Sequence, residues 1–257
     1  MDSAPVTSPA LAGPIGDCCV KTVQHAGQPH GNKVEIAGIP TYVTEPTSPT
    51  TGTEAKRVVL YFPDVFGPFY LNAQLLQDYY AAQGFYVLGI DYFFGDPVHL
   101  HLEEPGFDRP TWVAKSQKQA AEAVPKWIEG VQKIYGLGAK YSAVGYCFGA
   151  PYALEAAKND KVVAVAFAHP SRLNENHFKQ LTKPLLISAA EIDNAFSSES
   201  RRRAVDILIE KKATFHLQLF SGVAHGFATR GDIDIENTRW AKEESARSIA
   251  NWLIRFS

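Results

Sequence analysis

The sequence predicts an α/β fold in which helices cover both faces of a mainly parallel sheet. Several short apolar runs have the uninterrupted hydrophobicity of strands buried on both faces, as in residues 57–62. Segments with apolar residues at helical spacing separate these runs, as in residues 71–83. Regular alternation of strand and helix is typical of βαβ units, which build parallel sheets.

The predicted elements can be taken in chain order. Residues 33–43 indicate a hairpin of edge strands around Gly38, and residues 45–54, rich in Thr, Pro and Ser, indicate a loop. Further strands are expected at 57–62, 85–90, 140–143, 162–168, 184–189 and 214–220, and helices at 71–83, 111–135, 151–158, 174–181, 200–211 and 237–255. Pro125 should break or kink the longest helix because proline removes a backbone donor.

The expected domain organisation is simple. Residues 1–32 should form an N-terminal tail and irregular segment, since 1–16 are rich in Pro, Ala, Ser and Gly, and residues 33–257 should form a single domain. The N-terminus resembles no secretory leader and no segment could span a bilayer, so we expect a cytoplasmic protein without membrane partners.

Charge and cysteine content exclude other classes. The net charge is -2 and the one basic cluster, Arg201 to Arg203, lies in a predicted helix, so we expect no nucleic-acid partner. Three cysteines, two of them adjacent (Cys18 and Cys19), make a poor disulfide framework. This adjacent pair could be redox-active, although a structural role is the interpretation that we favour.

One motif stands out against this background. Residues 145–149 read Gly-Tyr-Cys-Phe-Gly between a predicted strand and a predicted helix. This is the G-x-S-x-G nucleophile elbow with Cys147 in place of serine. The helix that follows directs free N–H groups at the sulfur, which favours thiolate and supplies an oxyanion donor. Cys147 is therefore the predicted nucleophile, whereas an arbitrary free cysteine would more often be a small buried hydrophobe.

Other reactive side chains follow neighbouring strands, where ligands gather in parallel sheets. Asp193 follows the strand at 184–189, His225 follows the last strand, and Asp64 follows the strand at 57–62. The order Cys, Asp, His is that of the α/β-hydrolase catalytic triad. Glu191 competes with Asp193 as the acid, and we prefer Asp193 because it lies deeper in the loop.

These motifs resemble the dienelactone hydrolase family of cysteine-dependent α/β-hydrolases, which open enol-lactone rings. The resemblance extends from about residue 33 onward and includes Pro-Asp-Val-Phe-Gly at 63–67, Ala-Glu-Ile-Asp at 190–193 and Ala-His-Gly-Phe-Ala at 224–228. The Cys18–Cys19 pair and residues 36–38 resemble fungal members.

The resemblance implies that Cys147 is the nucleophile, His225 the base and Asp193 the residue that orients the base. It also implies that the backbone N–H groups of Val65 and Phe148 bind the oxyanion. Bacterial members have glutamate where Asp64 stands, so Asp64 is a candidate for tuning the thiol. His169, beyond another strand end, and Arg230 are candidates for lining the pocket.

The expected function is hydrolysis of a carboxylic ester, most of all a lactone or enol ester, as in carboxymethylenebutenolidase-like enzymes. A small-molecule substrate, no cofactor and a monomer or homodimer are expected. No metal is expected either, because His99, His101, Glu103 and Glu104 lie in a proline-rich loop without helical spacing. Two alternatives remain: a non-catalytic hydrolase-fold binding protein, and a cysteine amidase of the glutamine-amidotransferase type, which uses a His-x-Glu motif absent after His225.

Overall fold

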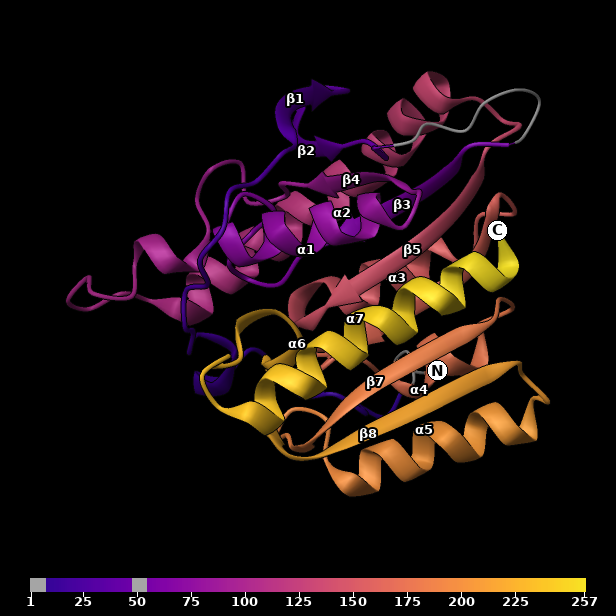
Figure 1. The fold of residues 1–257 in the computed structure, drawn as a ribbon. Helices are drawn as coiled ribbons and strands as arrows, with labels where there is room; N and C mark the ends of the chain where they lie inside the picture. The colour runs from indigo at the N-terminus through magenta and orange to yellow at the C-terminus, as the bar shows by residue number, and fades with distance from the viewer. Residues whose placement is uncertain (1–7, 48–54) are drawn as a thin grey trace, which may run out of the picture.

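The computed structural model describes residues 8–47 and 55–257, and their strands form one mixed sheet (Figure 1). The strand order is β1-β2-β4-β3-β5-β6-β7-β8. The strands are β1 Asn32–Ile36, β2 Ile39–Thr44, β3 Arg57–Phe62, β4 Tyr86–Ile90, β5 Lys140–Tyr146, β6 Val162–Ala168, β7 Leu185–Ile192 and β8 Phe215–Ala224. The β1–β2 and β2–β4 pairs are antiparallel and the remaining pairs are parallel, which confirms the predicted fold class.

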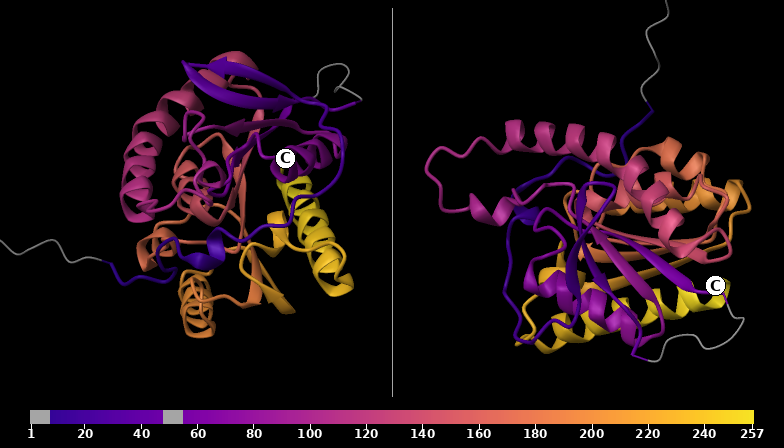
Figure 2. Two further views of the ribbon diagram at one scale, coloured as in Figure 1. Left: turned by 90° about the vertical axis from the view of Figure 1, so that its left-hand side faces the viewer. Right: turned by 90° about the horizontal axis from the view of Figure 1, so that it is seen from above.

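Helices cover both faces of the sheet, as Figure 2 shows. They are α1 Leu71–Ala82, α2 Arg109–Tyr135, α3 Ala150–Ala156, α4 Glu175–Lys179, α5 Ser198–Glu210, α6 Phe227–Arg230 and α7 Glu236–Phe256, with short 3-10 turns at η1 Asp17–Cys19, η2 Val98–Leu100 and η3 Cys147–Gly149. Helices α1, α6 and α7 pack on one face, and α2 to α5 pack on the other.

Alternation along the central strands explains this two-sided core. On β3, Leu60 belongs to the cluster under α2 to α5, whereas Val59 and Tyr61 belong to the cluster under α1 and α7. All three side chains are fully buried. Successive side chains of a strand point to opposite faces, so a strand buried on both sides must be apolar throughout.

The predicted break at Pro125 is wrong. Pro125 lies inside α2, which is one helix of 27 residues. The helix begins earlier than expected, at Arg109, because the Asp108 side chain accepts a hydrogen bond from the Thr111 N–H and caps the first turn. Strand β8 is also longer than predicted and ends at Ala224, directly before His225.

The N-terminal segment differs most from expectation. Residues 1–7 lie outside the described part, but residues 8–16 are not a free tail. The N–H groups of Leu11 and Ala12 both donate to the carbonyl oxygen of Leu173, and both side chains are buried. Ala10 also forms a bridge to Asn174. These contacts lead the chain across the carboxyl ends of the strands and place η1 there.

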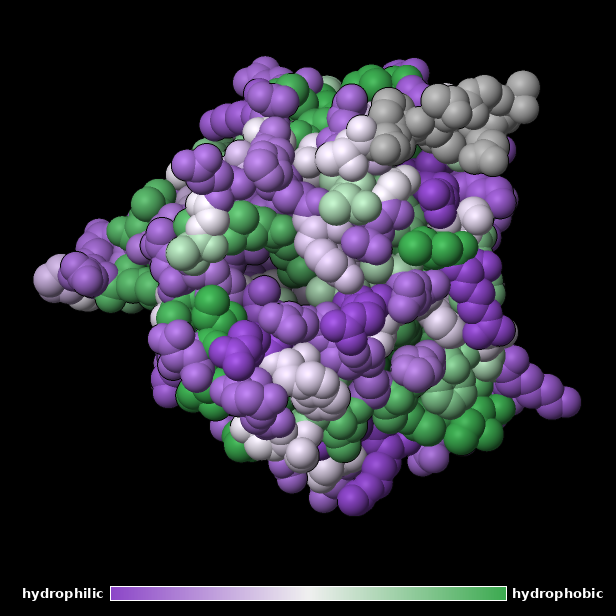
Figure 3. Space-filling view, viewed as in Figure 1, coloured by the Kyte–Doolittle hydropathy of each residue, from purple (hydrophilic) through white to green (hydrophobic). Residues whose placement is uncertain are grey.

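The face of the molecule that α7 covers has a mixed surface. Along the face that α7 covers, hydrophilic and hydrophobic residues are interspersed (Figure 3). Within the described ranges, no helix is both long enough and apolar enough to cross a bilayer. Most of the loop predicted at 45–54 lies outside the described residues.

Candidate active site

Cys147 stands at a strained turn between β5 and α3. Its φ is 47°, a left-handed conformation that non-glycine residues adopt at a cost. A Cβ on Gly145 would lie 2.6 Å from the carbonyl oxygen of Gly149, and one on Gly149 would collide with the Phe62 carbonyl. Both glycines are therefore required for the close approach of strand and helix, as the motif predicts.

His225 and Asp193 meet Cys147 in a continuous chain of contacts. Nε2 of His225 lies 3.2 Å from the Cys147 Sγ, and Nδ1 lies 3.0 Å from each carboxylate oxygen of Asp193. The competing acid, Glu191, instead accepts a hydrogen bond from the backbone N–H of Gly222. Asp193 is thus the carboxylate that holds the imidazole.

The carboxylate of Asp193 is itself fixed by the chain. Its Oδ1 accepts hydrogen bonds from the backbone N–H groups of Ala195 and Phe196, at 2.9 and 3.0 Å. Asp193 is 6% exposed, so these donors replace the solvent that a surface carboxylate would have. A carboxylate held in this way can orient the ring of His225 without moving.

Electrostatics favour a charged imidazole. Burial alone would lower the pKa of His225, but its hydrogen bonds with Asp193 and Cys19 outweigh burial and raise the pKa to about 10. The Cys147 side chain is fully buried, as is nearly all of His225. An imidazolium next to a sulfur that water cannot reach stabilises the thiolate form of a nucleophile.

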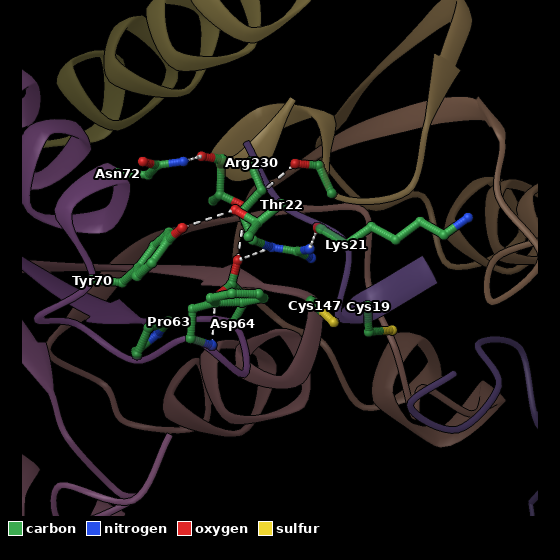
Figure 4. Close-up of polar contacts among 12 residues, drawn as sticks. Cys19, Lys21, Thr22, Pro63, Asp64, Tyr70, Asn72, Cys147 and Arg230 are labelled. Atoms are coloured by element: carbon green, nitrogen blue, oxygen red, sulfur yellow. Dashed lines mark hydrogen bonds and ion pairs between the residues drawn. The ribbon is translucent and has the colours of Figure 1, made fainter. Parts of the chain in front are cut away.

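Asp64 is bound by other partners than the thiol. Its Oδ1 accepts from the Phe66 N–H at 2.9 Å, and its Oδ2 accepts from Thr229 Oγ1 and Arg230 Nε, each at 2.8 Å. Figure 4 shows this carboxylate directed at the Arg230 guanidinium. Among the described residues, Cys147 is not one of its hydrogen-bond partners. Asp64 and Arg230 form a buried ion pair beside the sulfur.

The position of Arg230 explains why a full charge is tolerated here. Burial would lower its pKa, but the negative charges of Asp64 and Cys147 outweigh this and raise the pKa. One guanidinium nitrogen also donates to the carbonyl oxygen of Lys21, in the N-terminal segment. Arg230 therefore joins the loop after β3, α6 and the N-terminal segment around the site.

The two predicted oxyanion donors lie at adjoining strand ends. Strands β3 and β5 pair in parallel with Phe62 opposite Gly145, so the loop with Val65 and the turn with Phe148 leave the sheet together. No acceptor for the Val65 N–H is found in the described part of the chain. Phe148 follows the nucleophile directly, and its ring is fully buried against Tyr92.

His169 lies against the imidazole of His225. The two ring centroids are 5.0 Å apart in an edge-to-face arrangement, and His169 is fully buried. Within the described residues, neither of its ring nitrogens has a hydrogen-bond partner. Burial lowers its pKa well below the usual value, and the positive charges of His225 and Arg230 lower it further. His169 is therefore neutral and supports the ring of His225 by packing.

Sequence reasoning missed Cys19. Its Sγ lies 3.4 Å from His225 Nε2, the same nitrogen that contacts Cys147, and its side chain is fully buried. The two residues are 206 positions apart in the chain. The only available signal in the sequence was the adjacent cysteine pair. Because the N-terminal segment was expected to be a tail, this pair was not expected near the site.

Among the described residues, the loop histidines His99 and His101 belong to no group of three or more potential metal ligands. His101 bridges Asp96 and Glu104, at 2.6 and 2.8 Å, and His99 stacks on the ring of Phe66. The partners of His101 lie in its own loop, whereas His99 packs on the loop that follows β3.

Fold and site together define the class of protein: an α/β-hydrolase whose nucleophile elbow has a cysteine contacting a His–Asp pair. The chain belongs to the dienelactone hydrolase family, whose model matches residues 39–257. It is 37% identical to Dienlactone hydrolase 1 and 33% identical to Dienlactone hydrolase 2 of Gibberella moniliformis. These alignments cover 97% of both chains for the first relative, and 94% of this chain and 95% of the relative for the second.

Solved structures agree on the fold. A putative dienelactone hydrolase from Klebsiella pneumoniae has a TM-score of 0.70 at 15% identity, covering 90% of this chain and 100% of that one. The family assignment identifies the protein as a hydrolase of the dienelactone hydrolase type, with a small-molecule substrate.

Proposed function

We propose that this protein hydrolyses carboxylic esters, above all lactones and enol esters, through a thioester on Cys147. One observation supports this more than any other. The Cys147 Sγ lies 3.2 Å from Nε2 of His225, and Nδ1 of the same ring lies 3.0 Å from each carboxylate oxygen of Asp193. A nucleophile, a base and a group that orients the base are the arrangement required for acyl transfer.

In the first step, His225 holds the thiol proton on Nε2 and the sulfur of Cys147 attacks the ester carbonyl. Asp193 fixes the ring so that Nε2 faces the sulfur and stabilises the imidazolium. The N–H groups of Val65 and Phe148 receive the developing oxyanion. Loss of one such donor typically raises the barrier by about 3–4 kcal/mol.

In the second half of the reaction, the tetrahedral intermediate collapses and expels the alcohol or enol. The leaving oxygen takes the proton from His225, which then removes a proton from the water that hydrolyses the thioester. An enolate or phenolate competes well with a thiolate as leaving group. An amine leaves only if His225 protonates it first, and until then the thiolate is the better leaving group, so amides should be poor substrates.

The test compares esters with matched anilides. We expect aryl acetates and enol lactones to be hydrolysed and the corresponding anilides to give a kcat/KM that is lower by orders of magnitude. The ratio reports the difference in transition-state free energy. Comparable values for both would contradict the proposal and favour the amidase alternative. No turnover of any lactone or aryl ester in a broad panel would favour the non-catalytic alternative.

A further inference from the structure

Two thiols of the N-terminal segment lie beside the active-site imidazole. The sulfurs of Cys18 and Cys19 are 4.0 Å apart, and Cys19 Sγ is 3.4 Å from His225 Nε2. All three ligand atoms lie within 4.8 Å of one another, and they form the one such group of potential metal ligands in the described residues. Figure 4 shows the Cys19 side chain next to that of Cys147.

The segment that holds these thiols is anchored on both sides of them. Before the pair, Asp17 forms an ion pair with Arg109, at 2.5 Å. After the pair, the carbonyl oxygen of Lys21 accepts a hydrogen bond from Arg230, and the Val23 N–H donates to the carbonyl oxygen of Arg230. The two sulfurs are therefore held in place at the imidazole by contacts that do not involve the sulfurs.

Two of the three ligand separations match those of a tetrahedral zinc site. Zinc binds thiolate sulfur at about 2.3 Å and imidazole nitrogen at about 2.0–2.1 Å, which places two sulfurs about 3.8 Å apart and a sulfur and a nitrogen about 3.5 Å apart. The separation of the two sulfurs and that of Cys19 Sγ from His225 Nε2 differ from these values by only a few tenths of an ångström. Cys18 Sγ lies within 4.8 Å of the same nitrogen, so a small movement of this half-buried side chain completes the site. Two thiolates and an imidazole select soft or borderline ions over Mg²⁺ or Ca²⁺.

Access and charge also fit a cation. Cys19 is fully buried, but Cys18 is half-buried and opens the group to solvent. A divalent ion replaces the two thiol protons, so the ion and the two thiolates together carry no net charge. A neutral group is less costly to bury than a charged one. Three protein ligands leave the fourth tetrahedral position for water or for the neighbouring sulfur of Cys147, which is 3.2 Å from the same nitrogen.

We propose that Cys18, Cys19 and His225 bind a thiophilic divalent cation of the Zn²⁺ class, and that this ion inhibits hydrolysis reversibly. The ion occupies the Nε2 position that must hold the thiol proton. Inhibition follows from the proposed function, in which His225 is the base, whereas binding depends only on the three ligands.

Cadmium is the probe for binding, because each cadmium–thiolate bond adds ultraviolet absorbance. The full chain, reduced and treated with chelator, is titrated with Cd²⁺ alongside the Cys18→Ser variant. We expect one ion per wild-type chain. We expect the variant to show less thiolate absorbance and an affinity for Cd²⁺ that is at least about tenfold weaker. Tenfold is the low end of the loss in metal affinity that follows mutation of a residue that only hydrogen-bonds a metal ligand. The Cys18 side chain forms no hydrogen bond with Cys147, Asp193 or His225 in the described structure, so Cys18→Ser should keep its basal activity, which also shows that it folds.

The second arm measures aryl acetate hydrolysis with increasing Zn²⁺. We expect inhibition that chelator reverses, with at least about tenfold more Zn²⁺ needed for Cys18→Ser. Absence of Cd²⁺ binding by the wild type would overturn the proposal. Equal Cd²⁺ affinity in both proteins would overturn it too, because Cys18 would then not be a ligand of the metal. Binding that depends on Cys18 without inhibition would support the site and count against His225 as the base.

Discussion

The carboxylate of Asp64 and the guanidinium of Arg230 form an ion pair of 2.8 Å in which both side chains are almost completely buried. The pair lies beside Cys147. Burial lowers the pKa of Arg230, but the negative charge of Asp64 and, to a smaller extent, that of Cys147 raise it. Asp64 therefore acts on the sulfur through Arg230: it balances a positive charge that would otherwise stabilise the thiolate more strongly.

This arrangement predicts the effect of Asp64→Asn. The substitution removes one negative charge and leaves the Arg230 cation without its counterion near Cys147, so the thiolate should form more readily. The pH dependence of Cys147 inactivation by iodoacetamide should then move to lower pH. The exposed residue Asp160 supplies the control, Asp160→Asn, which should keep the wild-type profile. An unchanged profile in Asp64→Asn would show that the ion pair does not influence the thiol.

The acid of the triad gives a second prediction. Asp193→Asn keeps the shape of the side chain but favours the wrong tautomer of His225, a change that costs roughly 10⁴ in rate in other triads. Glu191→Gln is the matched control, because Glu191 is exposed and its side chain accepts one hydrogen bond in the described structure, from the Gly222 N–H. We expect kcat for aryl ester hydrolysis to fall by about that factor in the first variant alone. A larger loss in Glu191→Gln would reverse the assignment.

Much of this site could be predicted because its signals are local in the sequence. The spacing of Gly145, Cys147 and Gly149 reflects the contact between β5 and α3, two segments that follow each other directly. Asp193 and His225 could be placed because parallel strands bring their carboxyl ends to one edge. The continuous strands could be recognised because a sheet buried on both faces needs apolar residues at every position.

The remainder depends on contacts that no local pattern encodes. Composition indicated a tail for residues 8–16, but Leu11 and Ala12 are held by backbone bonds to Leu173, far away in the chain. Those contacts determine where Cys19 lies. Similarly, Arg230 could be named as a pocket residue, but its pairing with Asp64 depends on how α6 packs against the loop after β3. The expected break at Pro125 does not occur, and the neighbouring residues Val124 and Trp127 are buried in the core that α2 covers.

His169 predicts a pH dependence of stability. Its pKa is far below the usual value in the folded protein because burial disfavours its charged form, and His225 and Arg230, which face it, add positive charge. The unfolded chain protonates this histidine below about pH 6.5, whereas the folded protein does not, so the folded state loses stability as pH falls through that value. Between pH 7.5 and 5.5, one such group lowers the free energy of unfolding by about 1.4 kcal/mol.

The measurement is the free energy of unfolding at both pH values. Asparagine tolerates the positive φ of this position, 34°, so His169→Asn should fold and should lose about 1.4 kcal/mol less than the wild type between pH 7.5 and 5.5. His30→Asn, at an exposed histidine, is the control and should resemble the wild type. Identical pH dependence in His169→Asn and wild type would mean that the buried ring takes up a proton in the folded state.

The central claim is that Cys147 is the nucleophile, and kcat/KM of Cys147→Ala for an aryl acetate tests it most directly. Alanine keeps the Cβ at the strained turn, so thermal unfolding of the variant should resemble that of the wild type, while loss of a nucleophile typically lowers the rate by on the order of 10⁶. Cys147→Ser should also be severely impaired, because its hydroxyl is far harder to deprotonate than a thiol. A folded Cys147→Ala protein with kcat/KM near the wild-type value would contradict the account.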